Sequence, residues 1–375
     1  MSGVLFYVQH LLGVGHVKRA ASIVRAMQNY NVPVTIILGG EAVPHADFGG
    51  ADVRYLPSAR AEDETFKILL DENNNPIDDQ WRDARKAQLL EIADEIEPEI
   101  LFIELYPFGR RQFRFELIPL LEAYKGRAKI ICSARDVIVG KSQAKRNIEI
   151  TDTLNAYFDE VLVHGVEKVI PLHATFPYAD KIEDLLSYTG YVIEETRAAG
   201  ASDVGTREIL ISVGGGAVGE DLLRGIVAAH PLSANKSKPW RMIAGSSLPS
   251  DAYSDIEQCC GDGLSLERAR SDFIYVLRNC DLSISLGGYN TVMDVMSAKC
   301  RNLVVPFSGG VETEQLFRAK AFAEQGWINI FEGDVSNPNE LAEAIDNAAK
   351  RPAFEGQGLD INGADKTAQM IVRML

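Results

Sequence analysis

Residues 282–299 read LSISLGGYNTVMDVMSAK, an apolar run followed by two glycines and an amphipathic stretch. This order predicts a buried strand, a tight glycine turn and a helix. The turn leaves backbone N–H groups uncovered at the helix N-terminus, where the helix dipole also favours an anion. Asn290 and Asp294 share a helix face, about 6 Å apart along its axis. Since a carboxylate accepts hydrogen bonds from two neighbouring hydroxyls, Asp294 suits a ribose whose pyrophosphate lies at the helix tip.

An ordinary turn between a strand and a helix explains the same residues, so the choice between a ligand site and a plain turn depends on the segment that follows. Leu303–Phe307 predicts another short strand, residues 308–310 break it, and a helix is expected to start at Glu312 and to continue through Phe322. Acidic residues in a first turn are also expected for helix capping alone. Gln315 offers a donor and an acceptor, and Glu314 offers an acceptor, which is the chemistry that holds sugar hydroxyls.

These residues resemble the C-terminal half of the family 28 glycosyltransferases. The matching positions are Gly287, Gly288, Thr291, Asp294, Pro306, Gln315, Ala319 and Gly326. The family more often has Glu at the position of Asp294 and a second Gln at the position of Glu314. The resemblance implies a ribose contact at Asp294 and donor-sugar contacts at Glu314 and Gln315.

The same resemblance implies how the rest of the nucleotide is held. The backbone of Ile274 would pair with the base, for which a uridine donor is expected. The residues expected at the nucleotide and its diphosphate are Gly15, Gly214, Gly215, Gly216, Ile274, Gly287, Gly288, Asn290, Thr291 and Asp294. Packing of Phe273 and Ile274 in a core explains that segment equally well.

Composition narrows the class of protein. The chain has 375 residues, 46% apolar and 24% charged, with a formal net charge of -15. This length predicts two domains, since domains commonly hold about 100–150 residues. The acidic balance disfavours binding to nucleic acid, because that requires Lys and Arg to neutralise phosphates. The five cysteines show no metal-ligand spacing and indicate reduced thiols in a cytoplasmic protein. Val4–Leu12 is too short for a membrane span and lacks signal-peptide flanks.

Short apolar runs alternate with amphipathic stretches along the chain. In the first half, strands are expected at Val4–Val8, Val34–Leu38, Ile100–Ile103, Ala128–Ser133 and Glu160–His164, and helices at His16–Asn29, Asp79–Ile96 and Arg114–Tyr124. In the second half, strands are expected at Glu208–Val213, Trp240–Ala244, Leu282–Leu286 and Leu303–Val305. This alternation predicts an α/β fold with two doubly wound, Rossmann-like domains.

The expected domains are residues 1–165 on the acceptor side and residues 189–363 on the nucleotide-sugar side. A linker is expected at residues 166–188, which contain two prolines, and residues 63–79 are polar enough for a mobile loop. The final segment, residues 364–375, is expected to form a helix that can pack back on the first domain. By resemblance this arrangement is the GT-B type, in which the two domains face a cleft.

Each expected domain begins with a glycine loop at a strand end, where ligands of open α/β sheets bind. Residues 13–16 read GVGH, and residues 214–219 read GGGAVG. Neither loop is a full dinucleotide-binding fingerprint, so a nicotinamide cofactor is a weak alternative and no cofactor is expected. The second loop resembles the phosphate-side loop of family 28.

His16 is the candidate catalytic base. Its place at a helix start lowers an imidazole pKa and keeps the ring neutral. The GVGH segment resembles the glycine-histidine loop of family 28 and also that of nucleotide-sugar hydrolases. Glu104, at another strand end, is a second candidate acid or base, with Arg110 as an anion clamp, although a solvated loop explains those two residues equally well. Lys18 and Arg19 are expected to be solvated.

Together these features predict a metal-independent, inverting glycosyltransferase with a nucleotide-diphosphate donor. The acceptor is open and includes lipid-linked molecules and saccharides, and a peripheral position at the inner face of the membrane is compatible with it. The alternatives are a nucleotide-sugar hydrolase, in which His16 activates water, and a noncatalytic nucleotide-sugar-binding protein.

Overall fold

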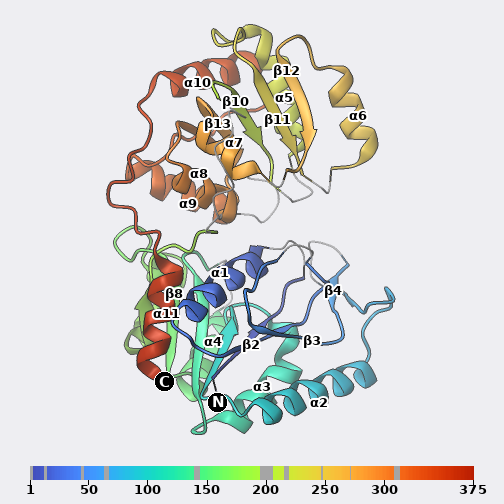
Figure 1. Cartoon of the computed structure of the whole chain (residues 1–375), viewed down its shortest axis with the longest axis vertical. Coiled ribbons are helices and arrows are strands. Elements are labelled where there is room, and N and C mark those ends of the chain that lie inside the picture. Colours follow the sequence, from blue (N-terminus) through green and yellow to red (C-terminus); the bar gives the residue numbers. More distant parts are fainter. Residues whose placement is uncertain are drawn as a thin grey trace. The chain divides into compact units, whose positions relative to one another are not determined.

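The computed structural model describes residues 3–11, 15–43, 46–62, 67–138, 144–194, 206–214, 219–245, 248–270, 272–307 and 313–375. The chain divides into two compact units, each with its own parallel sheet (Figure 1). Unit 1 comprises residues 1–194 and 360–375, and unit 2 comprises residues 195–359. The expected α/β fold with two doubly wound domains is confirmed.

Unit 1 is built on a parallel sheet with the strand order β3-β2-β1-β6-β7-β8-β9. Its strands are β1 Val4–Val8, β2 Val34–Leu38, β3 Asp52–Tyr55, β6 Ile100–Glu104, β7 Lys129–Arg135, β8 Glu160–His164 and β9 Leu186–Tyr188. Its helices are α1 Gly15–Asn29, α2 Asp79–Ile96, α3 Arg114–Tyr124, α4 Ala144–Tyr157 and α11 Gly363–Met374, with short 3-10 helices at Arg111–Phe113, Leu172–Ala174 and Ala179–Leu185. A small hairpin joins β4 Arg60–Ala61 to β5 Leu69–Leu70.

The sheet of unit 1 is buried on both faces because its strand residues alternate between two cores. Phe6 and Phe102 stack at 4.4 Å in one core, together with α1 and α11. Leu5 and Leu101 point into the other core, together with α2 and α3. Continuous burial of this kind explains why the strands read as unbroken apolar runs.

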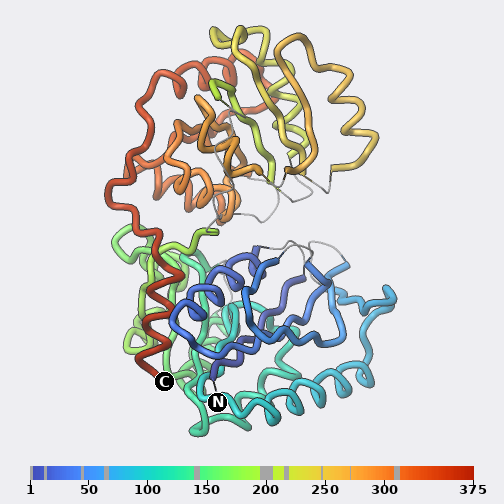
Figure 2. The backbone as a smooth tube through the Cα atoms, in the orientation of Figure 1, coloured from blue at the N-terminus to red at the C-terminus, as the bar shows by residue number. Residues whose placement is uncertain are grey.

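The C-terminal helix belongs to unit 1, in agreement with the sequence. Figure 2 follows the last, red segment to its place beside the blue α1. Ala368 and Ile371 of α11 are buried in the core that α1 lines. Tyr30 also donates a hydrogen bond to Asp365 at 2.8 Å.

Residues 166–188 are not the expected linker, since they lie within unit 1 and supply β9. The prolines in this segment stand in loops around 3-10 turns, and β9 then pairs with β8 in parallel. The expected mobile loop at residues 63–79 is likewise only partly a loop, because Leu69–Leu70 forms a strand paired with Arg60–Ala61.

Unit 2 is a parallel sheet with the order β12-β11-β10-β13-β14. Its strands are β10 Ile209–Ser212, β11 Trp240–Ala244, β12 Leu264–Arg268, β13 Leu282–Leu286 and β14 Asn302–Val305. Its helices are α5 Glu220–Ala229, α6 Ser250–Gln258, α7 Phe273–Asn279, α8 Tyr289–Ala298, α9 Glu314–Glu324 and α10 Pro338–Lys350, with a 3-10 turn at His230–Leu232.

In both units the strand order reverses at the first strand. The chain leaves β1 toward β2 and β3 and then returns to β6 on the other side of β1, and unit 2 repeats this course around β10 and β13. Ligands of doubly wound sheets bind at the carboxyl ends of such a strand pair. The topology therefore predicts ligand sites at the carboxyl ends of β1 and β6 in unit 1 and of β10 and β13 in unit 2.

Candidate functional site

His16 and Glu104 meet at the reversal point of unit 1. His16 is the second residue of α1, which follows β1, and Glu104 is the last residue of β6. The His16 Nδ1 atom lies 2.9 Å from Glu104 Oε1. The Glu104 side chain is fully buried, whereas 15% of the His16 side chain is exposed. The two candidate catalytic residues thus form one pair, of which the histidine reaches the surface.

The carboxylate of Glu104 is held from two further sides. Arg19 Nη2 forms an ion pair with Oε1, and the Ser133 hydroxyl bonds to Oε2. Burial by itself raises the pKa of Glu104, but the Arg19 charge and the hydrogen bonds from His16 and Ser133 outweigh burial and hold this pKa well below its usual range. Glu104 is therefore ionised near neutral pH.

The structure differs from two predictions made from the sequence, one for Arg19 and one for Glu104. Arg19 is not solvated, since its residue is only 3% exposed and bonds to Glu104. The reading of Glu104 as part of a solvated loop is also wrong, because it ends a buried strand. Sequence reasoning missed Ser133, which sits on β7, the strand next to β6.

The ionised carboxylate fixes the tautomer of His16. A carboxylate only accepts hydrogen bonds, so His16 Nδ1 must carry the hydrogen and Nε2 must carry a lone pair. Arg19 Nη2 lies 3.2 Å from His16 Nδ1, and both nitrogens donate to the same Glu104 oxygen. Burial lowers the pKa of His16 to about 3, with help from the Arg110 charge and against the hydrogen bond to Glu104. The ring is therefore neutral and presents a proton acceptor.

Positive charge surrounds this pair. Arg110, on the loop after β6, and Arg135, at the end of β7, both act on the pKa of His16 along with Arg19. Burial lowers the pKa of Arg110 to about 10, which still leaves it charged at neutral pH. The surroundings of His16 therefore suit an anionic group as well as a hydroxyl.

The two glycine loops of unit 2 meet at Thr291. Gly214 follows β10 with a φ of +68°, and a Cβ atom there would lie 3.4 Å from Thr291 Oγ1. A Cβ atom on Gly288, which precedes α8, would lie 3.9 Å from the same oxygen. The N-terminus of α8 therefore lies at the reversal point of unit 2. Gly215 and Gly216 lie outside the described residues.

Gln315 lies beside the glycine turn after β13. A Cβ atom on Gly287 would lie 3.3 Å from Gln315 Cβ, so α9 packs closely on this turn. The Gln315 Oε1 atom accepts a hydrogen bond from the Phe307 backbone at 3.2 Å, which fixes the orientation of the amide. The structure thus brings Gly287, Gly288, Thr291 and Gln315 to one place.

Other predicted nucleotide-site residues have structural partners. Glu314 forms a buried ion pair with Arg318 at 2.8 Å, and the Arg318 guanidinium stacks over the Tyr289 ring at 4.9 Å. Ile274 packs in a small core with residues such as Val276 and Leu277.

The polar residues predicted on α8 are accessible. Asn290, Thr291 and Asp294 are each half-buried in this helix. Contact of these residues and of Gly15 with a nucleotide stays a prediction, as do the ligand roles of Ile274, Glu314 and Gln315.

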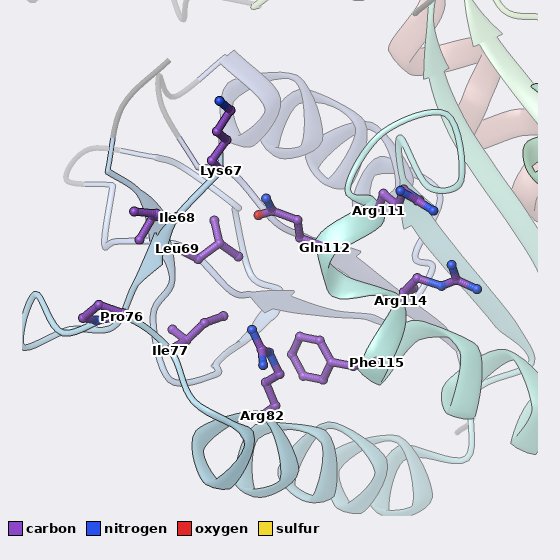
Figure 3. Close-up of a pocket in the computed structure, with 10 residues that line it drawn as sticks. All are labelled: Lys67, Ile68, Leu69, Pro76, Ile77, Arg82, Arg111, Gln112, Arg114 and Phe115. Atoms are coloured by element: carbon purple, nitrogen blue, oxygen red, sulfur yellow. The ribbon is translucent and has the colours of Figure 1, made fainter. Parts of the chain in front are cut away.

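Unit 1 also holds a hollow of about 630 Å³ between the β4–β5 hairpin, α2 and α3. Its described lining is Lys67, Ile68, Leu69, Pro76, Ile77, Arg82, Arg111, Gln112, Arg114 and Phe115. Figure 3 shows Leu69, Ile77 and Phe115 turned toward its middle, whereas Arg111 and Arg114 point away from it. The charged residues among this lining are all basic. Arg111, which lines the hollow, is next in the chain to Arg110, whose charge acts on His16.

The described residues form neither a metal-binding cluster nor a membrane-spanning helix. Within these residues, no group of three or more His, Cys, Asp or Glu side chains is placed to hold a metal ion. No helix in the described part of the chain has the length and hydropathy required to cross a membrane.

Part of the chain is similar in sequence to a known domain. Residues 210–369 match the glycosyltransferase family 28 C-terminal domain. The matched range includes Gly214, Ile274, the glycine turn before α8, Asp294 and Gln315. His16 and Glu104 lie outside the match.

A curated relative supports the same assignment. The UDP-N-acetylglucosamine--N-acetylmuramyl-(pentapeptide) pyrophosphoryl-undecaprenol N-acetylglucosamine transferase of Clostridium novyi (strain NT) is 24% identical over 166 residues, 37% of this chain. The match covers 46% of that relative, so the chain spans about half the length of the curated relative it matches.

Solved glycosyltransferases share the fold over nearly the whole chain. Acinetobacter baumannii MurG has a TM-score of 0.60 at 15% identity and covers 99% of both chains. The glycotransferase of kitacinnamycin has a TM-score of 0.65 at 14% identity and covers 100% of both. Spinosyn rhamnosyltransferase SpnG complexed with thymidine diphosphate has a TM-score of 0.62 at 16% identity and covers 100% of this chain and 96% of that one. The fold is therefore of the GT-B type.

Proposed function

We propose that this chain is a glycosyltransferase that uses a nucleoside diphosphate sugar, with uridine as the base, and inverts the anomeric centre without a metal. The observation that carries the proposal is the His16–Glu104 pair, a neutral histidine oriented by a buried carboxylate at the reversal point of unit 1. The family 28 domain at residues 210–369 supports the donor class. We further propose that the protein is cytoplasmic.

The acceptor hydroxyl is activated by His16 in this proposal. Its oxygen attacks the anomeric carbon, while its proton passes to His16 Nε2 and the bond from that carbon to the diphosphate oxygen breaks. The imidazolium that forms is stabilised by the ionised Glu104 at Nδ1. Burial lowers the pKa of His16, so the ring is neutral before the reaction and accepts the proton as the oxygen attacks. Attack opposite the leaving group inverts the centre.

The departing diphosphate gains negative charge, for which unit 2 offers backbone dipoles. The nearness of Gly214 to Thr291 at the N-terminus of α8 supports a role for their N–H groups as donors to this charge. Such donors stabilise developing charge without a metal ion. We assign the ribose contact to Asp294 and a donor-sugar contact to Gln315, whose fixed amide is oriented by Phe307.

The hollow in unit 1 supports an acceptor with an apolar portion and a negatively charged group. Leu69, Ile77 and Phe115 supply an apolar wall, Arg82 extends from α2 between Ile77 and Phe115, and Lys67 lies beyond Leu69 (Figure 3). Arg82 pairs with Asp79 at 2.8 Å, and Arg111 and Arg114 pair with Glu149 and point away from the hollow, so Lys67 and Arg82 are the lining cations that would meet an anion there. A lipid-linked phosphate or a phosphorylated saccharide with an apolar aglycone meets this description, and a lipid-linked acceptor would place the protein peripherally at the membrane inner face.

The test compares His16→Ala with His173→Ala, a matched change at an exposed histidine of unit 1. We expect His16→Ala to lower transfer about 10² to 10⁴-fold, the usual contribution of a general base. Affinity for UDP, measured by calorimetry, should stay at the wild-type value in both variants because the nucleotide binds unit 2. Full transfer activity in His16→Ala contradicts the mechanism. Release of free sugar at the same rate with and without acceptor identifies a hydrolase instead.

A further inference from the structure

His164 is a buried histidine that the proposed mechanism leaves unused. It ends β8, two strands from Glu104 in the sheet of unit 1, and its residue is 0% exposed. Its Nε2 atom lies 3.0 Å from Ser133 Oγ, and its Nδ1 atom lies 2.9 Å from Thr189 Oγ1. Since Ser133 also bonds to Glu104, an unbroken line of buried side chains runs from Thr189 to His16.

The direction of each hydrogen bond in this line follows from the ionised carboxylate. The Glu104 carboxylate only accepts hydrogen bonds, so the Ser133 hydroxyl donates its one hydrogen to Oε2. The Ser133 oxygen must then accept a hydrogen bond from His164 Nε2. His164 therefore donates from Nε2 to Ser133, and its Nδ1 is the unprotonated nitrogen. Three acceptors lie near the Thr189 hydroxyl: His164 Nδ1 at 2.9 Å, Gly190 O at 3.1 Å and Val163 O at 3.5 Å. Since Nδ1 is unprotonated and nearest, Thr189 donates its hydrogen to Nδ1. The protons on the Thr189 hydroxyl, His164 Nε2, the Ser133 hydroxyl and His16 Nδ1 thus all point toward Glu104.

We propose that His164 is a positioning residue for the Glu104–His16 pair, acting through Ser133, and that Thr189 fixes the tautomer that this role requires. The inference rests on the proposed function only for its effect on rate. The other tautomer of His164 would present a lone pair to Ser133 and draw the hydroxyl hydrogen away from Glu104. Glu104 would then lose one of the bonds that keep it ionised and oriented toward His16.

The far end of the line is anchored in the backbone. Thr189 precedes Gly190 and Tyr191, where the returning C-terminal segment pairs with unit 1. Tyr191 N donates to Asp360 O at 2.7 Å, and Gly363 N donates to Tyr191 O at 3.0 Å. Gly190 has a φ of +86°, and a Cβ atom on it would lie within 2.9 Å of the Asp360 carboxylate. This close pairing holds the Thr189 hydroxyl in place against His164.

The charged groups around His164 agree with a neutral ring. Burial lowers the pKa of His164 to about 3, with the Arg19 charge acting in the same direction and Glu104 opposing it. Around His16 the charges are Glu104 on β6, Arg19 on α1, Arg110 before α3 and Arg135 on β7. A neutral His164 adds a directed N–H donor without adding a further positive charge to this group.

The test uses two variants at the two ends of the line. Ser133→Ala removes the donor to Glu104, and Thr189→Val removes the donor to His164 while keeping the side-chain shape. Thr151→Val is the matched control, because Thr151 is also buried and its hydroxyl donates to the carbonyl of Asn147 in its own helix, at 2.9 Å, and not to the line from Thr189 to His16. Ser133→Thr keeps the hydroxyl and serves as the rescue.

We expect Ser133→Ala to lower kcat about 10- to 100-fold, the effect of losing a hydrogen bond to a charged group. The acid limb of its pH–rate profile should move to higher pH, because Glu104 loses a bond that favours its ionised form. Thr189→Val should lower kcat about 2- to 10-fold, Thr151→Val should leave it unchanged, and Ser133→Thr should recover most of it. UDP affinity should stay constant throughout.

The tautomer is read separately from activity by ¹⁵N NMR of the histidine ring nitrogens. In wild type, His16 should carry its hydrogen on Nδ1 and His164 on Nε2, and both variants should mix the His16 tautomers. Retained tautomers with an unchanged pH profile, beside a stability loss like that of Thr151→Val, would overturn the inference and leave a purely structural network. If no transfer is found, the proposed function fails, but the NMR comparison still decides the positioning role.

Discussion

Replacing Glu104 by Gln should separate the charge of this carboxylate from its shape. The substitution keeps a side chain of similar size but leaves Arg19, a residue only 3% exposed, without its counter-charge. Breaking a buried ion pair costs about 3–5 kcal/mol, so we expect the free energy of unfolding to fall by that amount. Transfer should fall about 10² to 10⁴-fold, since the amide neither stabilises an imidazolium nor fixes one His16 tautomer.

The effect on stability depends on pH in a defined direction. The folded-state pKa of Glu104 is lowered, so its contribution is present above the unfolded pKa of about 4.3 and is lost as pH falls through the folded-state value. Urea unfolding of wild type and Glu104→Gln, followed from pH 7 downward, should therefore show a gap that narrows with acidity.

A matched control is available within unit 1. Glu116 is also fully buried and pairs with a buried arginine, Arg85, at 2.8 Å. Glu116→Gln should lose comparable stability while retaining transfer below its unfolding temperature. If Glu104→Gln matches Glu116→Gln in both stability and transfer, the Glu104–His16 pair is structural and the catalytic reasoning is refuted.

Three further substitutions test the nucleotide and acceptor sites. Asp294→Ala should weaken UDP binding by about 1.5–3 kcal/mol in calorimetry, whereas Asp281→Ala, at a surface ion pair of unit 2, should not; equal affinities would remove the ribose contact. Gly214→Ala places a Cβ atom at a φ of +68°, so unit 2 should lose about 1–2 kcal/mol of stability, and unchanged urea unfolding would contradict this strain. Arg82→Gln should weaken dodecyl phosphate binding about threefold to fivefold, as expected of a part-exposed charge, and leave dodecanol unaffected; an equal loss for both would show that charge plays no part.

The regular elements were predictable because their signals are local. Val4–Val8, Val34–Leu38, Asp79–Ile96 and Leu282–Leu286 have the bounds expected from apolar runs and amphipathic stretches, and the structure adds that Asp78 caps α2. The position of β9 was not predictable, because its three residues are only half-buried and lie among prolines that suggest a linker. A short edge strand carries too few apolar residues to stand out.

The candidate site was predictable only in part, for a related reason. His16 follows β1 and Glu104 ends β6, so the rule for open α/β sheets pointed to both. Arg19 and Ser133 gave no such signal, because each joins the candidate site only through Glu104, which is 85 and 29 residues away along the chain. The burial of a charged or hydroxyl side chain depends on a partner that folding brings near, and one sequence does not reveal that partner.

During synthesis on the ribosome, unit 1 cannot complete its fold when residues 1–194 have been made, because residues 360–375 also belong to it. The face of α1 that receives α11 waits for residues 360–375, and all of unit 2 is synthesised in between. An apolar helix face is thus exposed to chaperones or to neighbouring nascent chains for the time that unit 2 takes to emerge. The pairing of Tyr191 with Asp360 and Gly363, which holds Thr189 against His164, also forms last. A chain truncated before its final helix would therefore retain unit 2 while lacking the backbone pairing that holds Thr189 against His164.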